Sequence, residues 1–324
     1  MMKLFALLLV PACFAGSLRL APLEREFQAL AAGFDGRAGV CAQDAGGRAC
    51  INAAHPFSLQ SVMKLLVAIA AMDAAGHHQL RLEDSVLVRR QDLSLFHQPL
   101  ADLVTDQGYR TTYADLIRRA VTDSDSAAAD ILVARLGGPR AVQACLTRLG
   151  VAGIRIDRDE RHLQTEIAGL EWRPEFVDAG VLKRAIDAVP AARRDKAYRA
   201  YQVDVRDTST PAAMAGMLFR LATGGLLPGP STRHLLDVME QTVTGEDRLK
   251  AGLAPGWKIG HKTGTSGSWN GVTAATNDAG ILTAPDGGIV SIAVFIADTK
   301  ASPAARAALI AKLAAAAIRH YATQ

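Results

Sequence analysis

Four short motifs carry side chains that could do chemistry together, and the first is Ser61-Val62-Met63-Lys64. In a helix, a spacing of three residues puts Ser61 and Lys64 on one face, one turn apart. A lysine beside a hydroxyl eases formation of an alkoxide, and a helix start offers a backbone N–H to an oxyanion. The same spacing also occurs where a serine caps a helix and a lysine three residues later lies on the surface. The otherwise apolar stretch around Lys64 favours either a chemical task or a side chain that reaches out to water.

Two polar stretches between helical runs supply further candidates. In Ser124-Asp125-Ser126, a hydroxyl can pass a proton to a leaving nitrogen. Serine and aspartate also favour helix caps, so the triplet alone indicates a cap. Glu160 and Gln164 pair a carboxylate with an amide, which can orient and activate a water. Taken alone, that stretch is typical of a solvated loop.

The fourth candidate is Lys262-Thr263-Gly264-Thr265, at the end of a strand-like stretch. A lysine, two hydroxyls and a glycine that admits close approach can cradle a carboxylate. The alternative is an edge strand with a protective lysine. Because several glycines fall within a few residues here, a plain strand is the weaker interpretation.

A scaffold must bring these distant motifs to one place. Strand patterns cover residues 39–43 and 48–52 near the start of the chain, and 257–265, 272–283 and 290–298 near its end. Apolar residues at helical spacing predict helices over 23–34, 61–75, 113–121, 126–136, 139–149, 210–222, 231–243 and 302–321. We therefore expect an α/β fold of the α+β type, with an antiparallel five-stranded sheet from both chain ends flanked by helices.

An all-helical lobe is expected to be inserted into that sheet lobe. The predicted sheet lobe comprises residues 16–60 and 226–324, and the helical lobe comprises residues 61–225. A cleft between two lobes is the natural place for a site.

Composition excludes several other classes of protein. The 324 residues are 49% hydrophobic and 21% charged, which indicates a globular core rather than disorder. A net charge of +4 without a basic stripe gives no basis for nucleic-acid binding. The eight histidines show no ligand spacing, so we expect neither a metal nor a cofactor.

The first 15 residues are typical of a secretory signal peptide. A lysine precedes an apolar run, and small residues follow up to a cleavage site expected after Ala15. Acylation of Cys13, as in a lipoprotein, is the weaker alternative because the residues before it match such a site poorly. We expect an exported protein, periplasmic or secreted, without stable membrane insertion.

Cys41 and Cys50 flank a tight-turn signal between two strand-like runs. If the turn centres on Ala45 and Gly46, the two cysteines face each other, and an oxidising compartment could join them. A shift of one residue in register would instead leave them unpaired.

The order of the four motifs is itself informative. It reads Ser-x-x-Lys, Ser-Asp-Ser, Glu-x-x-Leu-Gln and Lys-Thr-Gly, and with it the chain resembles the class A serine β-lactamases from Leu23 onwards. The resemblance is closest over residues 261–267 and 273–280, which are similar to the PER and VEB types of extended-spectrum enzyme.

The resemblance implies a role for each motif. Ser61 would attack the β-lactam, and Lys64 would assist its deprotonation, directly or through Glu160 and a water. Ser124 would relay a proton to the β-lactam nitrogen. Glu160 would then activate the water that hydrolyses the acyl-enzyme. The backbone N–H groups of Ser61 and Thr265 would form the oxyanion hole.

The last motif would bind the substrate, through Lys262, Thr263, Gly264 and Thr265. Many relatives add an arginine on the following strand, but residues 268–276 contain none. Arg248 aligns with a position from which some relatives supply that charge. We expect it to bind the substrate carboxylate, the alternative being an ordinary surface arginine.

The chain also departs from the family pattern. Ser126 and Gln164 stand where the family usually has asparagines, which contact the substrate's side-chain amide and the hydrolytic water, respectively. Residues 165–205 are longer than the family norm, and a helical run over 181–189 predicts an insertion beside the cleft.

Two other functions stay open at this point. A D-alanyl-D-alanine peptidase or another penicillin-binding serine hydrolase shares two motifs but lacks the carboxylate of Glu160. A non-catalytic β-lactam-binding module would not need all four motifs. We expect a monomer whose partner is a small β-lactam, and the motifs do not define which β-lactams it prefers.

Overall fold

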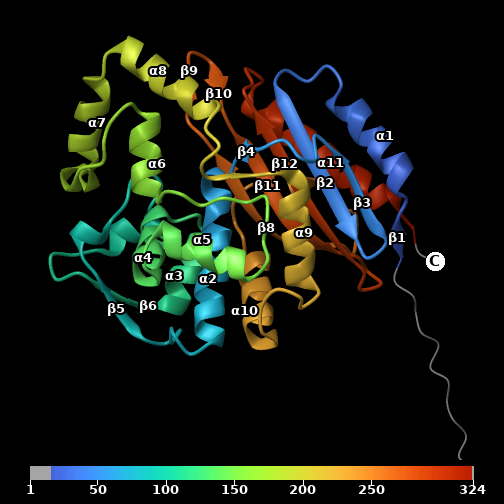
Figure 1. Cartoon of the computed structure of the whole chain (residues 1–324), viewed down its shortest axis with the longest axis horizontal. Helices are drawn as coiled ribbons and strands as arrows, with labels where there is room; N and C mark the ends of the chain where they lie inside the picture. The colour runs from blue at the N-terminus through green and yellow to red at the C-terminus, as the bar shows by residue number, and fades with distance from the viewer. Residues whose placement is uncertain (1–15, 323–324) are drawn as a thin grey trace, which may run out of the picture.

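A five-stranded antiparallel sheet joins the two ends of the chain in the computed structural model, which describes residues 16–322 (Figure 1). The strand order is β3-β2-β12-β11-β8. Its members are β2 (Arg37–Asp44), β3 (Gly47–Ile51), β8 (Lys258–Thr265), β11 (Thr276–Thr283) and β12 (Ile289–Ala297). The predicted fold class is confirmed. The signal peptide predicted over residues 1–15 lies outside the described residues.

Both faces of this sheet are buried, because its strands are apolar on both sides. On β12, Ile292 and Val294 pack toward α1 (Leu20–Ala31) and α11 (Pro303–His320), in one apolar cluster. Ala293 and Phe295 alternate with them and belong to the cluster on the other side of the sheet. The sheet is therefore a middle layer, which explains the nearly continuous apolar sequence of β12.

The helical part of the chain surrounds α2 (Met63–Gly76), whose residues from Met63 to Ala74 are all buried. A helix that is apolar on every side belongs in a core. The remaining helices are α3 (Tyr113–Thr122), α4 (Ser126–Leu136), α5 (Pro139–Arg148), α6 (Glu160–Ile167), α7 (Ala179–Asp187), α8 (Ala191–Gln202), α9 (Pro211–Ala222) and α10 (Gly229–Glu240). Among residues 16–322, no helix has the length and apolarity needed to cross a bilayer.

Short strand pairs and 3-10 turns complete the fold. The pairs are β1 (Ser17–Leu18) with β13 (Tyr321–Ala322), β4 (Phe57–Ser58) with β7 (Thr208–Ser209), β5 (Ser85–Val88) with β6 (Tyr109–Thr112), and β9 (Ser268–Trp269) with β10 (Val272–Thr273). The 3-10 turns are η1 (Gln60–Val62), η2 (Arg90–Asp92), η3 (Pro99–Leu103), η4 (Pro174–Val177) and η5 (Leu249–Gly252).

The hairpin of β2 and β3 has the register that lets its two cysteines face each other. Asp44 pairs with Gly47, which centres the turn on the two residues between them, and Cys41 pairs with Cys50. A disulfide joins the two cysteines. The one-residue shift that would have left them unpaired does not occur.

Three local features of the structure differ from what the sequence indicated. The Glu160–Gln164 stretch is the start of helix α6, not a loop, because the side chain of Asp159 caps it by accepting from the N–H of His162. The single strand predicted over 272–283 is interrupted at Ala274, whose N–H donates to the Tyr198 hydroxyl. The insertion contains two helices, α7 and α8, instead of one.

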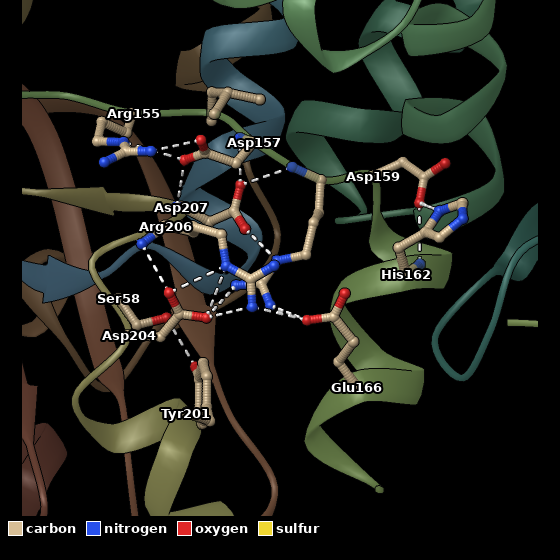
Figure 2. Close-up of polar contacts among 12 residues, drawn as sticks. Ser58, Arg155, Asp157, Asp159, His162, Glu166, Tyr201, Asp204, Arg206 and Asp207 are labelled. Carbon is tan, nitrogen blue, oxygen red and sulfur yellow. Dashed lines mark hydrogen bonds and ion pairs between the residues drawn. The ribbon is translucent and has the colours of Figure 1, made fainter. Parts of the chain in front are cut away.

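A buried ion network closes the segment that carries α6, α7 and α8. The guanidinium of Arg158 is 6% exposed, and its Nε lies 2.6 Å from Asp207 at the far end of the segment. Its other nitrogens reach Asp204 at 3.1 Å and Glu166 at 2.5 Å. Figure 2 shows these three carboxylates converging on one point. Because Asp207 is fully buried, its charge depends on this arginine for compensation.

We predict that Arg158→Ala lowers the free energy of unfolding by about 3 kcal/mol, because it leaves a buried carboxylate without its partner. Arg155→Ala is the control, since its ion pair with Asp157 is half exposed and is expected to contribute about 1 kcal/mol or less. Urea unfolding of both variants measures the difference. Equal losses would contradict the role assigned to burial.

Candidate active site

Ser61 lies in the turn η1, between β4 and α2, and two strands of the sheet hold this turn. The side-chain amide of Asn277 on β11 donates to the carbonyl oxygens of Ser58 and Leu59 at 2.8 and 3.0 Å. On β8, a Cβ at Gly264 would lie 2.6 Å from the Leu59 oxygen and 3.2 Å from the Ser61 nitrogen. Only glycine therefore lets β8 come this close to the Ser61 backbone.

Lys64 is almost completely buried, at 1% exposure, and is surrounded by oxygen atoms. Its Nζ lies 3.0 Å from Ser61 Oγ, 3.1 Å from Ser126 Oγ and 2.8 Å from the carbonyl oxygen of Ser124. The same nitrogen lies 3.1 Å from Glu160 Oε1. One ammonium group thus touches a hydroxyl and a carboxylate at the same time.

A second buried lysine approaches from the sheet. Lys262 Nζ donates to Ser124 Oγ and to the carbonyl oxygen of Thr263, both at 2.9 Å. Burial lowers the pKa of Lys262 well below its ordinary value, and the nearby charge of Lys64 lowers it further. An amine with a lowered pKa beside a hydroxyl is well suited to exchanging a proton with it.

Glu160 is buried at the start of α6, and its backbone and side chain are both held. Its N–H donates to Asp130 Oδ1 at 2.9 Å. Gln164, one turn later, donates from Nε2 to Glu160 Oε2 at 3.2 Å and to Gln60 Oε1 at 3.1 Å. The amide that replaces the family's usual asparagine therefore still reaches the carboxylate.

Cationic and hydroxyl groups gather at the end of β8. Arg248 donates to Thr265 Oγ1 at 2.7 Å and to the Asn277 carbonyl at 2.9 Å. Thr263 Oγ1 lies 2.7 Å from the hydroxyl of Thr244. The structure thus brings Arg248 to the Lys-Thr-Gly motif, although fifteen residues or so separate them in sequence.

Ser61, Glu160 and Thr265 line a cleft of about 370 Å³. The insertion forms part of the wall through Ile186, Arg194 and Tyr198. The Tyr198 hydroxyl accepts from Ala274 N–H and lies 2.9 Å from the carbonyl oxygens of Gly267, just before β9, and Val272 on β10. Figure 1 shows α8 next to these strands. Other wall residues are Gln60, Leu95, Phe96, His97, Ser126, Gln164, Ile167, Ala168, Gly267, Ser268 and Trp269.

Sequence reasoning missed several residues that support the site. Asn277 lies in one of the stretches of closest resemblance, and a polar side chain on an otherwise buried strand was the available signal. Asp130 and Gln60 carried no local pattern that distinguishes them from ordinary surface residues. Tyr201 lies on an inserted helix whose packing no motif predicts.

The geometry is suited to acyl transfer through a serine. The Ser61 hydroxyl contacts the Lys64 ammonium, and Glu160 lies within reach of the same group. A lysine can assist attack by the hydroxyl, and a separate carboxylate can activate a water afterwards.

Comparison with known proteins identifies the family. A model of the Beta-lactamase enzyme family matches residues 22–321. The solved structure of an ancestral (GNCA) class A β-lactamase superimposes with a TM-score of 0.73 at 29% identity, covering 92% of this chain and all of the other. The chain belongs to the class A serine β-lactamases. Its activity is therefore β-lactam hydrolysis.

Two relatives of this β-lactamase come from Pseudomonas aeruginosa. Beta-lactamase VEB-1 is 28% identical over 253 residues, which cover 77% of this chain and 73% of VEB-1. The extended-spectrum beta-lactamase PER-1 is 28% identical over 267 residues, which cover 82% of this chain and 75% of PER-1. The predicted similarity to these two types is confirmed.

The carboxyl group that holds Glu160 gives this β-lactamase a pH-dependent stability. Asp130 accepts from Glu160 N–H and, at 2.6 Å, from Ser94 Oγ. Burial, together with the charges of Asp159 and Glu160, raises the pKa of Asp130 to about 7. Its protonation therefore stabilises the fold below the ordinary aspartate pKa, and this contribution is lost as the pH rises through 7.

We predict that the free energy of unfolding of Asp130→Asn, relative to that of the parent enzyme, is higher at about pH 8 than at about pH 5. The parent must bury a charged carboxylate at the higher pH, whereas asparagine carries no charge. Urea unfolding at both pH values measures the two free energies. If the difference between variant and parent does not change with pH, the assigned pKa of Asp130 is wrong.

Proposed function

We propose that the enzyme opens the β-lactam amide through an acyl-enzyme on Ser61 and releases the product with a water activated by Glu160. The observation that supports this most strongly is the position of Lys64 Nζ, 3.0 Å from Ser61 Oγ and 3.1 Å from Glu160 Oε1. A hydroxyl, an amine and a carboxylate in one buried contact can exchange protons without bulk water.

In the proposed acylation, the Ser61 proton passes to Lys64, or through a water to Glu160, as Oγ attacks the carbonyl carbon. The backbone N–H groups of Ser61 and Thr265 stabilise the oxyanion, which is consistent with the close approach of Gly264 to the Ser61 backbone. The C–N bond then breaks, and the nitrogen takes a proton from Ser124. Lys262, 2.9 Å from Ser124 Oγ, can return that proton.

In the proposed deacylation, Glu160 removes a proton from a water, and the resulting hydroxide attacks the ester carbon. The ester bond breaks, and Ser61 Oγ takes up the proton that Glu160 removed from the water, passed on through Lys64 between them. Gln164 lies against Glu160 Oε2 and is placed to orient the water with it. This step separates a hydrolase from a penicillin-binding peptidase, which lacks such a carboxylate.

Substrate binding is proposed at the end of β8, where Thr263, Thr265 and Arg248 would hold the carboxylate with Lys262 behind them. Gly264 leaves room for the β-lactam beside this strand. Ser126 contacts Lys64 at 3.1 Å and is shorter than asparagine, so its contact with the substrate's side-chain amide would need a bridging water.

We also propose that the enzyme is exported through residues 1–15, and that it acts as a monomer on a small β-lactam without a metal or other cofactor. We propose, in addition, that the chain forms two lobes, residues 16–60 with 226–324 and residues 61–225, and that the cleft lies between them.

Replacement of Glu160 tests the proposed reaction. We predict that Glu160→Ala still acylates on Ser61 but accumulates the acyl-enzyme, because the water lacks its base. Intact-protein mass spectrometry with a penicillin should show a transient adduct in the parent enzyme and a long-lived one in the variant. Glu171→Ala is the control, an exposed glutamate of the same segment that is expected to behave like the parent. A variant that turns over at the parent rate would refute the role of Glu160.

Replacement of Arg248 tests carboxylate binding. We predict that Arg248→Ala raises KM by about tenfold while kcat falls less, because a charge-assisted hydrogen bond to the carboxylate is lost. The control is Lys250→Ala, which removes an exposed cation from the same segment. Unchanged steady-state kinetics of the Arg248 variant would be inconsistent with the proposal.

A further inference from the structure

The inserted helix α8 reaches the back of the nucleophile turn through one hydroxyl. Tyr201 is 6% exposed, and its hydroxyl lies 2.7 Å from Ser58 Oγ, a contact that Figure 2 shows directly. The side-chain amide of Gln60 donates from Nε2 to the same hydroxyl oxygen. Because burial raises the pKa of Tyr201, the hydroxyl stays neutral at any physiological pH.

A chain of side-chain amides continues from this hydroxyl to Glu160. Gln60 uses Nε2 toward Tyr201 and Oε1 toward Gln164, whose Nε2 lies 3.1 Å away. The two hydrogens of Gln164 Nε2 have two acceptors, Gln60 Oε1 and Glu160 Oε2. Every link therefore joins a donor to an acceptor.

The donor-to-acceptor direction of these hydrogen bonds matters because the terminal amide of a glutamine can rotate by half a turn and exchange its oxygen and nitrogen. If Gln60 flipped, its amide hydrogens would face those of Gln164. Gln164 would then have to turn its oxygen toward the Glu160 carboxylate, which repels it. An anchor that accepts from Gln60 Nε2 opposes this rearrangement, and the Tyr201 hydroxyl oxygen is in the position to accept that hydrogen bond.

The backbone of Gln60 gives a second reason for an anchor. Gln60 precedes the nucleophile and has φ = +46°, in the left-handed region that side chains other than glycine rarely adopt. Such a conformation persists only where the surroundings hold it. The side chain of Gln60 is 1% exposed and is held at both ends of its amide, by Tyr201 and by Gln164.

We propose that Tyr201 is a positioning residue for deacylation. Its hydroxyl couples the inserted helix to Glu160 through Gln60 and Gln164. This inference rests on the proposed function of Glu160. It assigns the insertion a part in the water-activating step, beyond its place in the wall of the cleft.

A neighbouring tyrosine provides a matched comparison. Tyr198, one turn earlier on α8, is also buried, but its hydroxyl contacts backbone groups of Gly267, Val272 and Ala274. These backbone groups are not part of the hydrogen-bonded chain that leads through Gln60 to Glu160. Loss of either hydroxyl removes the same chemical group from the same helix.

The test is Tyr201→Phe, which keeps the ring and removes the hydroxyl. We expect the deacylation rate to fall about tenfold, from the loss of an oriented hydrogen bond, with little change in the acylation rate. kcat and KM should then fall together while kcat/KM stays near the parent value. Mass spectrometry after mixing with a penicillin should show more acyl-enzyme at steady state than in the parent. Gln60→Leu should give the same pattern, and the double variant should lose little more.

Tyr198→Phe is expected to raise KM without accumulation of acyl-enzyme. The proposal is overturned if Tyr201→Phe, folded by circular dichroism and by thermal unfolding, keeps the parent kcat and KM, or if acylation and deacylation slow equally. Failure of the underlying function is distinguishable, because the parent enzyme would then show no turnover dependent on Glu160.

Discussion

The burial of one positive charge organises this site. Removing an ammonium group from water is costly unless it is paired and hydrogen-bonded, and Lys64 is 1% exposed in the first turn of an apolar helix. Its partners come from three separate segments: Ser61 in the preceding turn, Ser126 at the start of α4 and Glu160 at the start of α6. The fold can bury Lys64 only if these segments meet, so stability and chemistry require the same contact.

The sheet contributes to this contact from the other side. Its edge strand β8 brings Lys262 to Ser124, and the absence of a side chain at Gly264 lets that strand lie against the nucleophile turn. Asn277 on the next strand holds the same turn through two backbone carbonyls. Because β11 and β12 are buried on both faces, these contacts rest on a rigid layer rather than on loops.

The insertion between α6 and β7 is more than an addition at the surface. Arg158 and Asp207 close the longer segment that carries α6, α7 and α8 with a buried ion pair. Tyr198 attaches α8 to the backbone around β9 and β10, and Tyr201 attaches it to Ser58. A long segment loses much conformational entropy when it is ordered, and buried polar contacts of this kind offset that cost. The cleft of this enzyme is therefore shaped by residues that lie outside the four motifs.

The sequence by itself determined the sheet from both chain ends and the motif residues, because alternation, helical spacing and turn chemistry are local properties. It left two registers open for the cysteine hairpin, and the packed sheet decided between them. It did not determine that Glu160 begins a helix, nor that the strand after the Lys-Thr-Gly motif breaks at Ala274, since the latter depends on contact with Tyr198. The supporting roles of Asp130 and Gln60 were decided only by tertiary structure. A hydrogen bond between residues distant in the chain leaves no periodic trace in either segment, so only the packed fold can reveal it.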